Sequence, residues 1–310
     1  MKKGLNEKDA QIIFQEYLDS ELRGITCHGF QAFPKFGAEL VELAGGEAEV
    51  IEEGDNFLYI NGKKNLGQIV CNKYVPKLIE KAKENNIAMM GIFNMHSYLR
   101  PGTYARMAAE NDVVGFVFNY GGRKRIAPYG SIDPFFGTNP IAIGIPGENS
   151  PIEVDMATSK TAMMKVRLAA KLNKELPEGI AIDKDGSPTT DPNGAMDGAL
   201  LPFGSHKGSG LALVIELLTK TMFKIDINDK IKANRGYLFI FFDPRTFTNL
   251  EEFKKDVSKL AGEIKHLRKA EGIDEILIPG EKEQRLLRKK LEEGYLEIDD
   301  KIVEDIKELL

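Results

Sequence analysis

The sequence predicts an α/β protein in which a central α/β unit is nested inside a more helical domain. Residues 73–205 alternate strand and helix patterns and are dense in Gly and Pro, whereas both ends of the chain are more helical. Of the 310 residues, 42% are hydrophobic and 29% are charged, which is typical of a globular protein large enough for two domains. We therefore expect residues 1–72 and 206–310 to form one discontinuous, largely helical domain with some strands, and residues 73–205 to form the other.

The first half of the chain shows both helical and strand periodicity. Ile12, Ile13, Tyr17 and Leu18 recur at helical spacing, so residues 7–22 should form an amphipathic helix with Asn6 as its N-cap. A loop rich in Gly, His and Pro follows. The expected elements after it are two short strands within 49–60, a helix at 73–86, a strand at 87–93, a helix at 104–111 and a buried strand at 113–119.

The second half continues with short strands and ends in charged helices. We expect strands at 140–146 and 152–155, then helices at 159–172 and 207–223. Residues 235–243 are the clearest strand, because they are a run of aromatic and β-branched residues. Helices at 250–271 and 280–293 and a short helix near the C-terminus complete the prediction.

Charge and composition exclude several classes of partner. The net charge of −5 provides no general basic field for nucleic acid or an anionic membrane. The apolar runs are too short and interrupted to span a bilayer, and the start of the chain lacks a signal-peptide pattern. Only Cys27 and Cys71 are present as cysteines, so we expect free thiols in a reducing cytoplasm.

The usual nucleotide-binding motifs are absent from the sequence. Neither G-x-G-x-x-G after a strand nor G-x-x-x-x-G-K-[ST] occurs, which excludes a Rossmann turn and a P-loop.

Three histidines are candidates for chemistry. His28 lies in a loop, where an imidazole could donate a proton to a carbonyl oxygen, although a local hydrogen bond would also explain it. His96 follows a predicted strand. His206 and Lys207 begin a predicted helix, where they could bind phosphate, or His206 could simply cap the helix. No metal-ligand spacing links these histidines.

Two further segments combine turns with polar groups. Thr138 lies in a tight turn, Gly137-Thr138-Asn139-Pro140. Asp155, Met156 and Ala157 end a predicted strand and lead into a predicted helix, so they could bind an anion or act as an N-cap.

Several motifs occur in the same order as in one known family. They are Arg23-Gly24-x-Thr26-Cys27-His28-Gly29, Ala127-Pro128-Tyr129-Gly130, Gly137-Thr138-Asn139-Pro140-Ile141-Ala142, Asp155-Met156-Ala157-Thr158-Ser159, Asp183-x-Asp185-Gly186-x-Pro188-Thr189-Thr190-Asp191-Pro192, Leu201-Pro202-Phe203-Gly204-Ser205-His206-Lys207-Gly208 and Pro279-Gly280-Glu281-Lys282-Glu283. Through them the chain resembles the malate/L-lactate dehydrogenase family, which includes L-sulfolactate and ureidoglycolate dehydrogenases and cyclic-imine reductases.

This resemblance implies a fold, a reaction and a set of site residues. The fold would be the non-Rossmann, L-sulfolactate dehydrogenase-like one, in a homodimer with the active site between subunits. The activity would be reduction of a small 2-oxo acid with NAD or NADP as cofactor. The implied catalytic residues are His28 as proton donor, Cys27 beside it, and Lys165. Thr138 would contact the substrate. The implied cofactor-binding residues are His96, Asp155, Met156, Ala157, His206, Lys207, Pro279, Gly280 and Glu281.

The sequence also departs from the family pattern near the expected substrate. Cys27 replaces a serine and is a weaker hydrogen-bonding partner. Ala32 and Phe36 stand where many members carry an arginine that binds a carboxylate and a tyrosine. A carboxylate in a partly dry pocket needs a cationic partner. We therefore expect Arg100 to replace the missing arginine, with Arg123 and Arg125 as alternatives.

Two other functions remain open on these residues. One is reduction of a cyclic imine such as pyrroline-2-carboxylate. The other is a cofactor-binding protein whose substrate site has decayed, which the loss of an arginine at Ala32 would suggest.

Overall fold

The computed structural model describes residues 5–34, 45–225 and 235–308. Within these ranges the chain forms two compact units. Unit 1 contains residues up to 117, 142–154 and 239 onward, and unit 2 contains residues 118–141 and 155–238.

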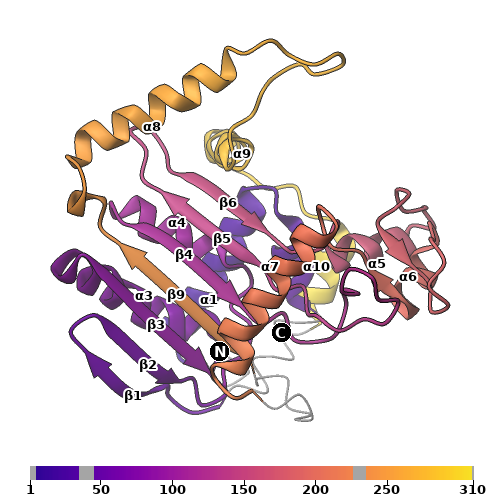
Figure 1. The fold of residues 1–310 in the computed structure, drawn as a ribbon, viewed down its shortest axis with the longest axis horizontal. Coiled ribbons are helices and arrows are strands. Elements are labelled where there is room, and N and C mark those ends of the chain that lie inside the picture. Colours follow the sequence, from indigo (N-terminus) through magenta and orange to yellow (C-terminus); the bar gives the residue numbers. More distant parts are fainter. Residues whose placement is uncertain (1–4, 35–44, 226–234, 309–310) are drawn as a thin grey trace. The chain divides into compact units, whose positions relative to one another are not determined.

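Unit 1 is built on a mixed sheet with the strand order β1-β2-β3-β9-β4-β5-β6 (Figure 1). The strands are β1 (Glu49–Gly54), β2 (Phe57–Asn61), β3 (Ile87–Phe93), β4 (Val114–Asn119), β5 (Ile141–Ile145), β6 (Ile152–Met156) and β9 (Gly236–Phe242), of which four run on into unit 2 at one end. Strands β1 and β2 form an antiparallel hairpin, and β2 pairs in parallel with β3, with Phe57 opposite Met89. The aromatic strand predicted at 235–243 is therefore a central strand, β9.

The helices of unit 1 follow the predicted order. They are α1 (Glu7–Leu22), α3 (Gly67–Asn85), α4 (Gly102–Glu110), α8 (Leu250–Lys265), α9 (Glu281–Glu293) and α10 (Asp300–Lys307). Asn6 caps α1 as predicted, because its Oδ1 accepts a hydrogen bond from the Asp9 amide at 2.9 Å. Helix α3 packs on β3 and buries Val75, Leu78 and Ala82 completely.

Helix α4 approaches the sheet closely because two strand residues lack a side chain. A Cβ atom on Gly144 would lie 2.0 Å from the Ala105 carbonyl oxygen, and one on Gly115 would lie 2.8 Å from the Ala108 Cβ. This contact fixes the helix that carries Arg106 against β4 and β5.

Unit 2 contains helices α5 (Met163–Lys171), α6 (Pro192–Asp197) and α7 (His206–Glu216), and the short paired strands β7 (Ala181–Ile182) and β8 (Ala199–Leu200). Helix α7 continues into a π-helical segment, Leu217–Thr221. The main apolar cluster of the unit includes Met163, Val166, Leu176, Ala195 and Leu200.

Several predicted boundaries differ from the structure, and three of the differences bear on the fold. Helix α3 begins at Gly67, before the predicted residue 73. Helix α5 begins at Met163, after the predicted residue 159, because Lys160 donates its amide to the Leu201 carbonyl instead of entering a helix. The units also divide differently from the predicted domains 1–72 with 206–310 and 73–205. A boundary at residue 72 would separate β2 from β3, which are hydrogen-bonded to each other.

Among the described helices, none has the length and apolar character that crossing a membrane requires.

Candidate functional site

His28 lies at the end of a short 3₁₀ helix, Thr26–His28, in unit 1. Its Nδ1 lies 3.3 Å from the Cys27 Sγ, so the two residues predicted to act together are in contact. Burial, and then the nearby positive charge of Arg100, lower the pKa of His28 to about 4. The imidazole is therefore neutral at pH 7 in the protein without ligands.

The loop that carries His28 is fixed to the end of α1. The Phe30 amide donates to the Glu21 Oε2 at 3.0 Å, and Lys290 of α9 donates to the Glu21 carbonyl at 2.6 Å. A Cβ atom on Gly29 would lie 2.1 Å from the same carboxylate oxygen, so only glycine allows this approach. The Arg23-to-Gly29 motif thus places His28 by short contacts to a helix end.

The segment after β3 carries the other predicted residues of unit 1. His96 is 2% exposed, and its amide donates to the Asn65 carbonyl at 3.0 Å. Arg100 is 4% exposed, and its Nη1 lies 2.9 Å from the Glu153 Oε1 on β6. Arg100 is therefore a buried residue and not a solvated surface residue. Its positive charge is one of the causes of the lowered pKa of His28.

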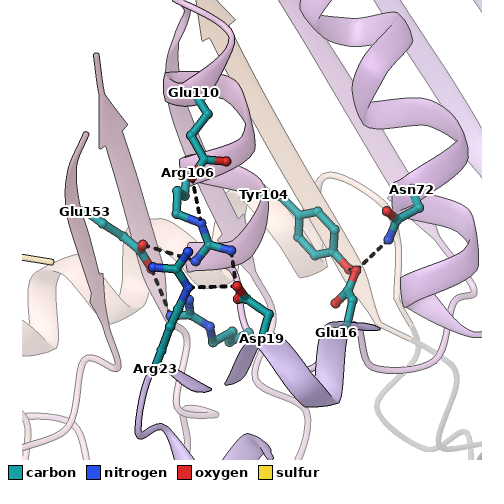
Figure 2. A network of polar contacts seen from close by, with 9 residues as sticks. Glu16, Asp19, Arg23, Asn72, Tyr104, Arg106, Glu110 and Glu153 are labelled. Atoms are coloured by element: carbon teal, nitrogen blue, oxygen red, sulfur yellow. Dashed lines mark hydrogen bonds and ion pairs between the residues drawn. The ribbon is translucent and has the colours of Figure 1, made fainter. Parts of the chain in front are cut away.

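Through Glu153, Arg100 belongs to a buried network of ion pairs. Figure 2 labels the other members, Asp19, Arg23, Arg106, Glu110 and Glu153. Glu153 also accepts from Arg106 at 3.5 Å. Arg106 in turn contacts Asp19 at 2.8 Å and Glu110 at 3.4 Å. The network ends at Arg23, whose Nε lies 2.8 Å from the Asp19 carboxylate. Below, "the arginine network" denotes Asp19, Arg23, Arg100, Arg106 and Glu153, with Glu110 at its exposed edge.

Glu16 lies next to this network and is itself buried (Figure 2). Its Oε1 accepts from the Tyr104 hydroxyl at 2.8 Å and from the Asn72 amide at 2.6 Å. Burial raises the pKa of Glu16 to about 7, although the hydrogen bonds from Tyr104 and Asn72 lower it. Glu16 therefore carries a proton in acidic solution and loses it near neutral pH.

Ala32 is 5% exposed and packs in an apolar cluster with Ile13, Tyr17 and Leu66, against which Leu99 also packs. The position at which the family resemblance led us to expect an arginine is thus surrounded by apolar contacts, one of them from the residue before Arg100. Phe36, the other departure in this loop, lies outside the described residues.

In unit 2, the predicted Thr138 lies beside the segment that follows β6. Its carbonyl accepts hydrogen bonds from both the amide and the hydroxyl of Thr158, each at 3.0 Å. The Thr158 carbonyl accepts from the Phe203 amide at 3.0 Å. Three motifs that are far apart in the sequence therefore meet, and Asp155, Met156 and Ala157 lie immediately before the junction, with Asp155 and Met156 exposed.

The entry to α7 is strained and carries positive charge. Gly204 and Ser205 have φ values of +54° and +61°, and such a conformation is costly for serine. His206 and Lys207 follow as exposed first-turn residues, and Tyr129 packs edge-on against the His206 ring with centroids 5.9 Å apart. The first turn has no acidic residue, and the Ser205 side chain caps none of the described amides. Such a helix start suits an anion.

Asn139 is a functional candidate that sequence reasoning missed. It is fully buried, its Oδ1 accepts from the Gly121 amide at 3.0 Å, and its Nδ2 donates to the Glu216 carboxylate at 2.8 Å. Glu216 also binds Lys220 in the π-helical segment at 2.6 Å. Asn139 thus fixes the Thr138 turn to α7. Its place in a Gly-Thr-Asn-Pro turn was the available signal, but its partners are distant in the sequence.

The other residues predicted for the site are Lys165, Arg125 and the motif Pro279-Gly280-Glu281. Lys165 is exposed on α5. The Pro279 carbonyl accepts from the Glu153 amide at 3.2 Å, and Glu281 contacts Lys265 and Arg285, so this motif anchors α9 and β6. Burial, and then Arg167 and Arg123, lower the pKa of Arg125 in unit 2. No group of three or more metal-binding side chains gathers among the described residues.

Residues 1–307 match the model of the family described as malate/L-lactate dehydrogenase. A malate/(S)-sulfolactate dehydrogenase of Methanothermus fervidus is 38% identical over 99% of this chain and 91% of its own length. A Δ1-pyrroline-2-carboxylate/Δ1-piperideine-2-carboxylate reductase of Pseudomonas putida is 30% identical over 99% and 92%. The solved sulfolactate dehydrogenase of Methanocaldococcus jannaschii matches with a TM-score of 0.88 at 36% identity, covering 99% of this chain and 91% of that one.

Proposed function

The chain belongs to the malate/L-lactate dehydrogenase family, and from this premise we propose that it reduces a small 2-oxo acid to a 2-hydroxy acid with NADH or NADPH. The structural observation that supports this most is the placement of His28: its Nδ1 contacts the Cys27 Sγ, and its loop is held against the end of α1. A proton carrier and a buried guanidinium group, that of Arg100, suit a substrate that has both a carbonyl and an anionic group. The names of two relatives, a malate/(S)-sulfolactate dehydrogenase and an L-sulfolactate dehydrogenase, agree with such a substrate.

In this proposal His28 is the proton donor. A hydride adds to the carbonyl carbon, the carbonyl π electrons move to the oxygen, and this oxygen takes the proton from the imidazolium of His28. Because Nδ1 faces the Cys27 Sγ, the Nε2 atom is the one we assign to the substrate. In the reverse direction, neutral His28 takes the hydroxyl proton while the hydride leaves the carbon.

The low pKa of His28 has a consequence for the direction of the reaction. Without substrate the imidazole is neutral at pH 7 and ready to accept a proton, as oxidation of a hydroxy acid requires. Reduction requires the protonated form. A substrate anion bound at Arg100 would offset the positive charge that opposes protonation, and so raise the pKa of His28. Binding of the anion and protonation of the donor are therefore coupled.

Several of the proposed cofactor residues belong to unit 2. The cation of Lys207, the imidazole of His206 and the uncapped start of α7 suit the phosphates of a dinucleotide, and the exposed Asp155–Met156 segment lies in the adjoining motif. When bound, the reduced nicotinamide supplies the hydride. Thr138 is proposed to contact the substrate, and Lys165, His96 and residues 279–281 keep the family roles that the sequence implies. A cytoplasmic homodimer is part of the same proposal.

The runner-up is reduction of a cyclic imine, because the relative from Pseudomonas putida carries that name. A direct test measures loss of nicotinamide absorbance with NADH and with NADPH, against a panel of 2-oxo acids and cyclic imine carboxylates. The proposal predicts turnover of at least one 2-oxo acid. Turnover of imines alone would favour the runner-up, and cofactor binding without any turnover would indicate a decayed substrate site.

A further inference from the structure

Arg235 directly precedes β9, on a stretch of backbone that unit 2 holds in place. The Gly236 carbonyl accepts a hydrogen bond from the Tyr120 amide at 3.0 Å, which joins the start of β9 to the residue that follows β4. A Cβ atom on Gly236 would lie 1.6 Å from the Thr219 carbonyl oxygen, so only glycine allows the π-helical segment to approach this closely. The backbone next to Arg235 is therefore fixed by contacts on β4 and on the π-helical segment.

The guanidinium group of Arg235 packs against Gly122, in the loop that follows β4. A Cβ atom on Gly122 would lie 3.3 Å from the Arg235 Nε, 3.4 Å from its Nη2 and 3.5 Å from its Cζ. Gly122 also has a φ of +81°, a conformation that favours glycine. The absence of a side chain at Gly122 thus leaves room for the guanidinium group.

Gly121, the residue before, packs against the turn that contains Thr138. The Gly121 amide donates to the Asn139 Oδ1 at 3.0 Å. A Cβ atom on Gly121 would lie 2.4 Å from the Thr138 amide nitrogen and 2.8 Å from the Thr138 Oγ1. The Thr138 hydroxyl and the Arg235 guanidinium therefore lie against two consecutive glycines of one loop. This arrangement brings a cation near the residue that we propose as a substrate contact.

Arg235 differs in its charge balance from the arginines of unit 1. Each guanidinium group of the arginine network contacts a carboxylate, whereas Arg235 forms no ion pair within the parts of the chain that the structure describes. Over the same ranges, Arg123 and Lys124 of the adjoining loop form none either. The buried carboxylate of this region, Glu216, already binds Lys220 at 2.6 Å. The positive charge around Gly122 thus favours an added anion.

Backbone donors also lie next to the guanidinium group. The amides of Gly122 and Arg123 form no hydrogen bond with the described residues, while those of Gly121 and Arg125, on either side, donate within the protein. A guanidinium group and backbone N–H groups bind the oxygens of a carboxylate or sulfonate through charge-assisted hydrogen bonds. The loop and Arg235 therefore offer the donors that such a group requires.

We propose that Arg235, together with the Gly121-Gly122 loop, binds a second acidic group of the substrate, so that the enzyme selects 2-oxo acids with two anionic groups. This inference rests on the proposed function and adds to it a residue that sets the substrate class. The contact of Thr138 and Arg235 with neighbouring glycines is the reason for assigning the anion to the substrate instead of the cofactor. The second group can be a carboxylate or a sulfonate, because both present oxygens to the guanidinium.

The test compares oxaloacetate, which has two carboxylates, with pyruvate, which has one, in steady-state kinetics at saturating cofactor. Arg235→Gln should raise the KM for oxaloacetate about tenfold or more, the size of a lost charge-assisted contact, and change the KM for pyruvate by less than about twofold. Lys124→Gln is the matched control. Lys124 belongs to the same loop, but its Nζ lies over the Phe135 ring at 5.4 Å, so both KM values should equal those of the wild type.

The wild type provides a test that does not depend on the folding of a variant. Its kcat/KM should be higher for oxaloacetate and 3-sulfopyruvate than for pyruvate. Arg235→Lys, which keeps the charge but loses the planar fork, should reduce this preference.

Three results would overturn the inference and leave the proposed function in place. They are equal kcat/KM values of the wild type for oxaloacetate and pyruvate, an unchanged oxaloacetate KM in folded Arg235→Gln, and an equal effect of Lys124→Gln. A rise in the KM for NADH or NADPH alone would assign Arg235 to the phosphates of the cofactor and would also overturn it. A wild-type protein that turns over no 2-oxo acid would overturn both.

Discussion

Arg100 Nη1 lies 2.9 Å from Glu153 Oε1, and this contact joins two segments that are 53 residues apart in the sequence. One segment follows β3 and ends in the strained turn at Leu99, and the other is strand β6. The positive charge of this buried Arg100 also contributes to the low pKa of His28, the residue that we propose as proton donor.

Removing the imidazole tests the role of His28. His28→Gln should leave the affinity for the nicotinamide cofactor close to that of the wild type and lower turnover about 10²–10⁴-fold, the usual loss for a general acid. Cofactor binding by fluorescence titration and kcat from absorbance give both values. A fall in turnover of less than about tenfold would return His28 to a local packing role.

The pH dependence of reduction should report the influence of Arg100. Because the donor must be protonated, kcat/KM for the oxo acid should fall as the pH rises above the low pKa of His28, about 4. Arg100→Met removes a charge that lowers this pKa. The fall should then begin at a higher pH, while the KM rises. A profile that Arg100→Met does not move would contradict the proximity of the two groups.

Lys207 should serve the cofactor. Lys207→Ala removes a cation from the start of α7, so the KM for NADH or NADPH should rise, with a smaller effect on the KM for the oxo acid. Lys184→Ala, another exposed lysine of unit 2, is the control. The opposite order of effects would assign the α7 start to the substrate.

A structural feature could be predicted from the sequence when the residues that determine it are close together in the chain. Asn6 as the cap of α1, strand β9 and the location of His28 follow from local patterns, and the structure has the cap and the strand where they were expected. The early start of α3 and the late start of α5 depend on tertiary pairing, as between Lys160 and Leu201.

The ion-pair partner of Arg100 also depends on tertiary structure and could not be predicted from the sequence. The sequence indicated Arg100 through its departure from the family pattern, but nothing local points to Glu153, or to Glu216 below Asn139. Buried ion pairs form between side chains that the fold brings together, so their members look like ordinary surface charges in the sequence.

The stability of the protein should depend on Glu16 in a way that changes with pH. Its pKa is 4.5 when unfolded and about 7 when folded, so its contribution is fully present below pH 4.5 and is lost as the pH rises through about 7. Over this pH range, the contribution of Glu16 to the free energy of unfolding changes by about 3 kcal/mol. Relative to the wild type, Glu16→Gln should therefore be more stable at pH 8 than at pH 4.5, as measured by denaturant unfolding. The exposed Glu84→Gln is the matched control.

The titration of His28 should change the stability in the opposite direction, over a pH range that overlaps that of Glu16. Its folded pKa of about 4 is below the unfolded value of 6.5, so its contribution is present above pH 6.5 and is lost as the pH falls through about 4. Between these values the effects of Glu16 and His28 offset each other in the wild type. Glu16→Gln should thus lose stability on acidification more steeply than the wild type does, and equal slopes would contradict the assignment.

In the proposed reaction a hydride moves from the nicotinamide to the carbonyl carbon of a 2-oxo acid. This transfer can be tested with NADH or NADPH that carries deuterium at C4 of the nicotinamide on the transferred face, followed by NMR of the product. We expect the wild type to form a 2-hydroxy acid with deuterium on C2, and His28→Gln to form the same product at a much lower rate. No deuterated hydroxy acid from any 2-oxo acid of the panel, or deuterium found only in a cyclic amine product, would contradict it.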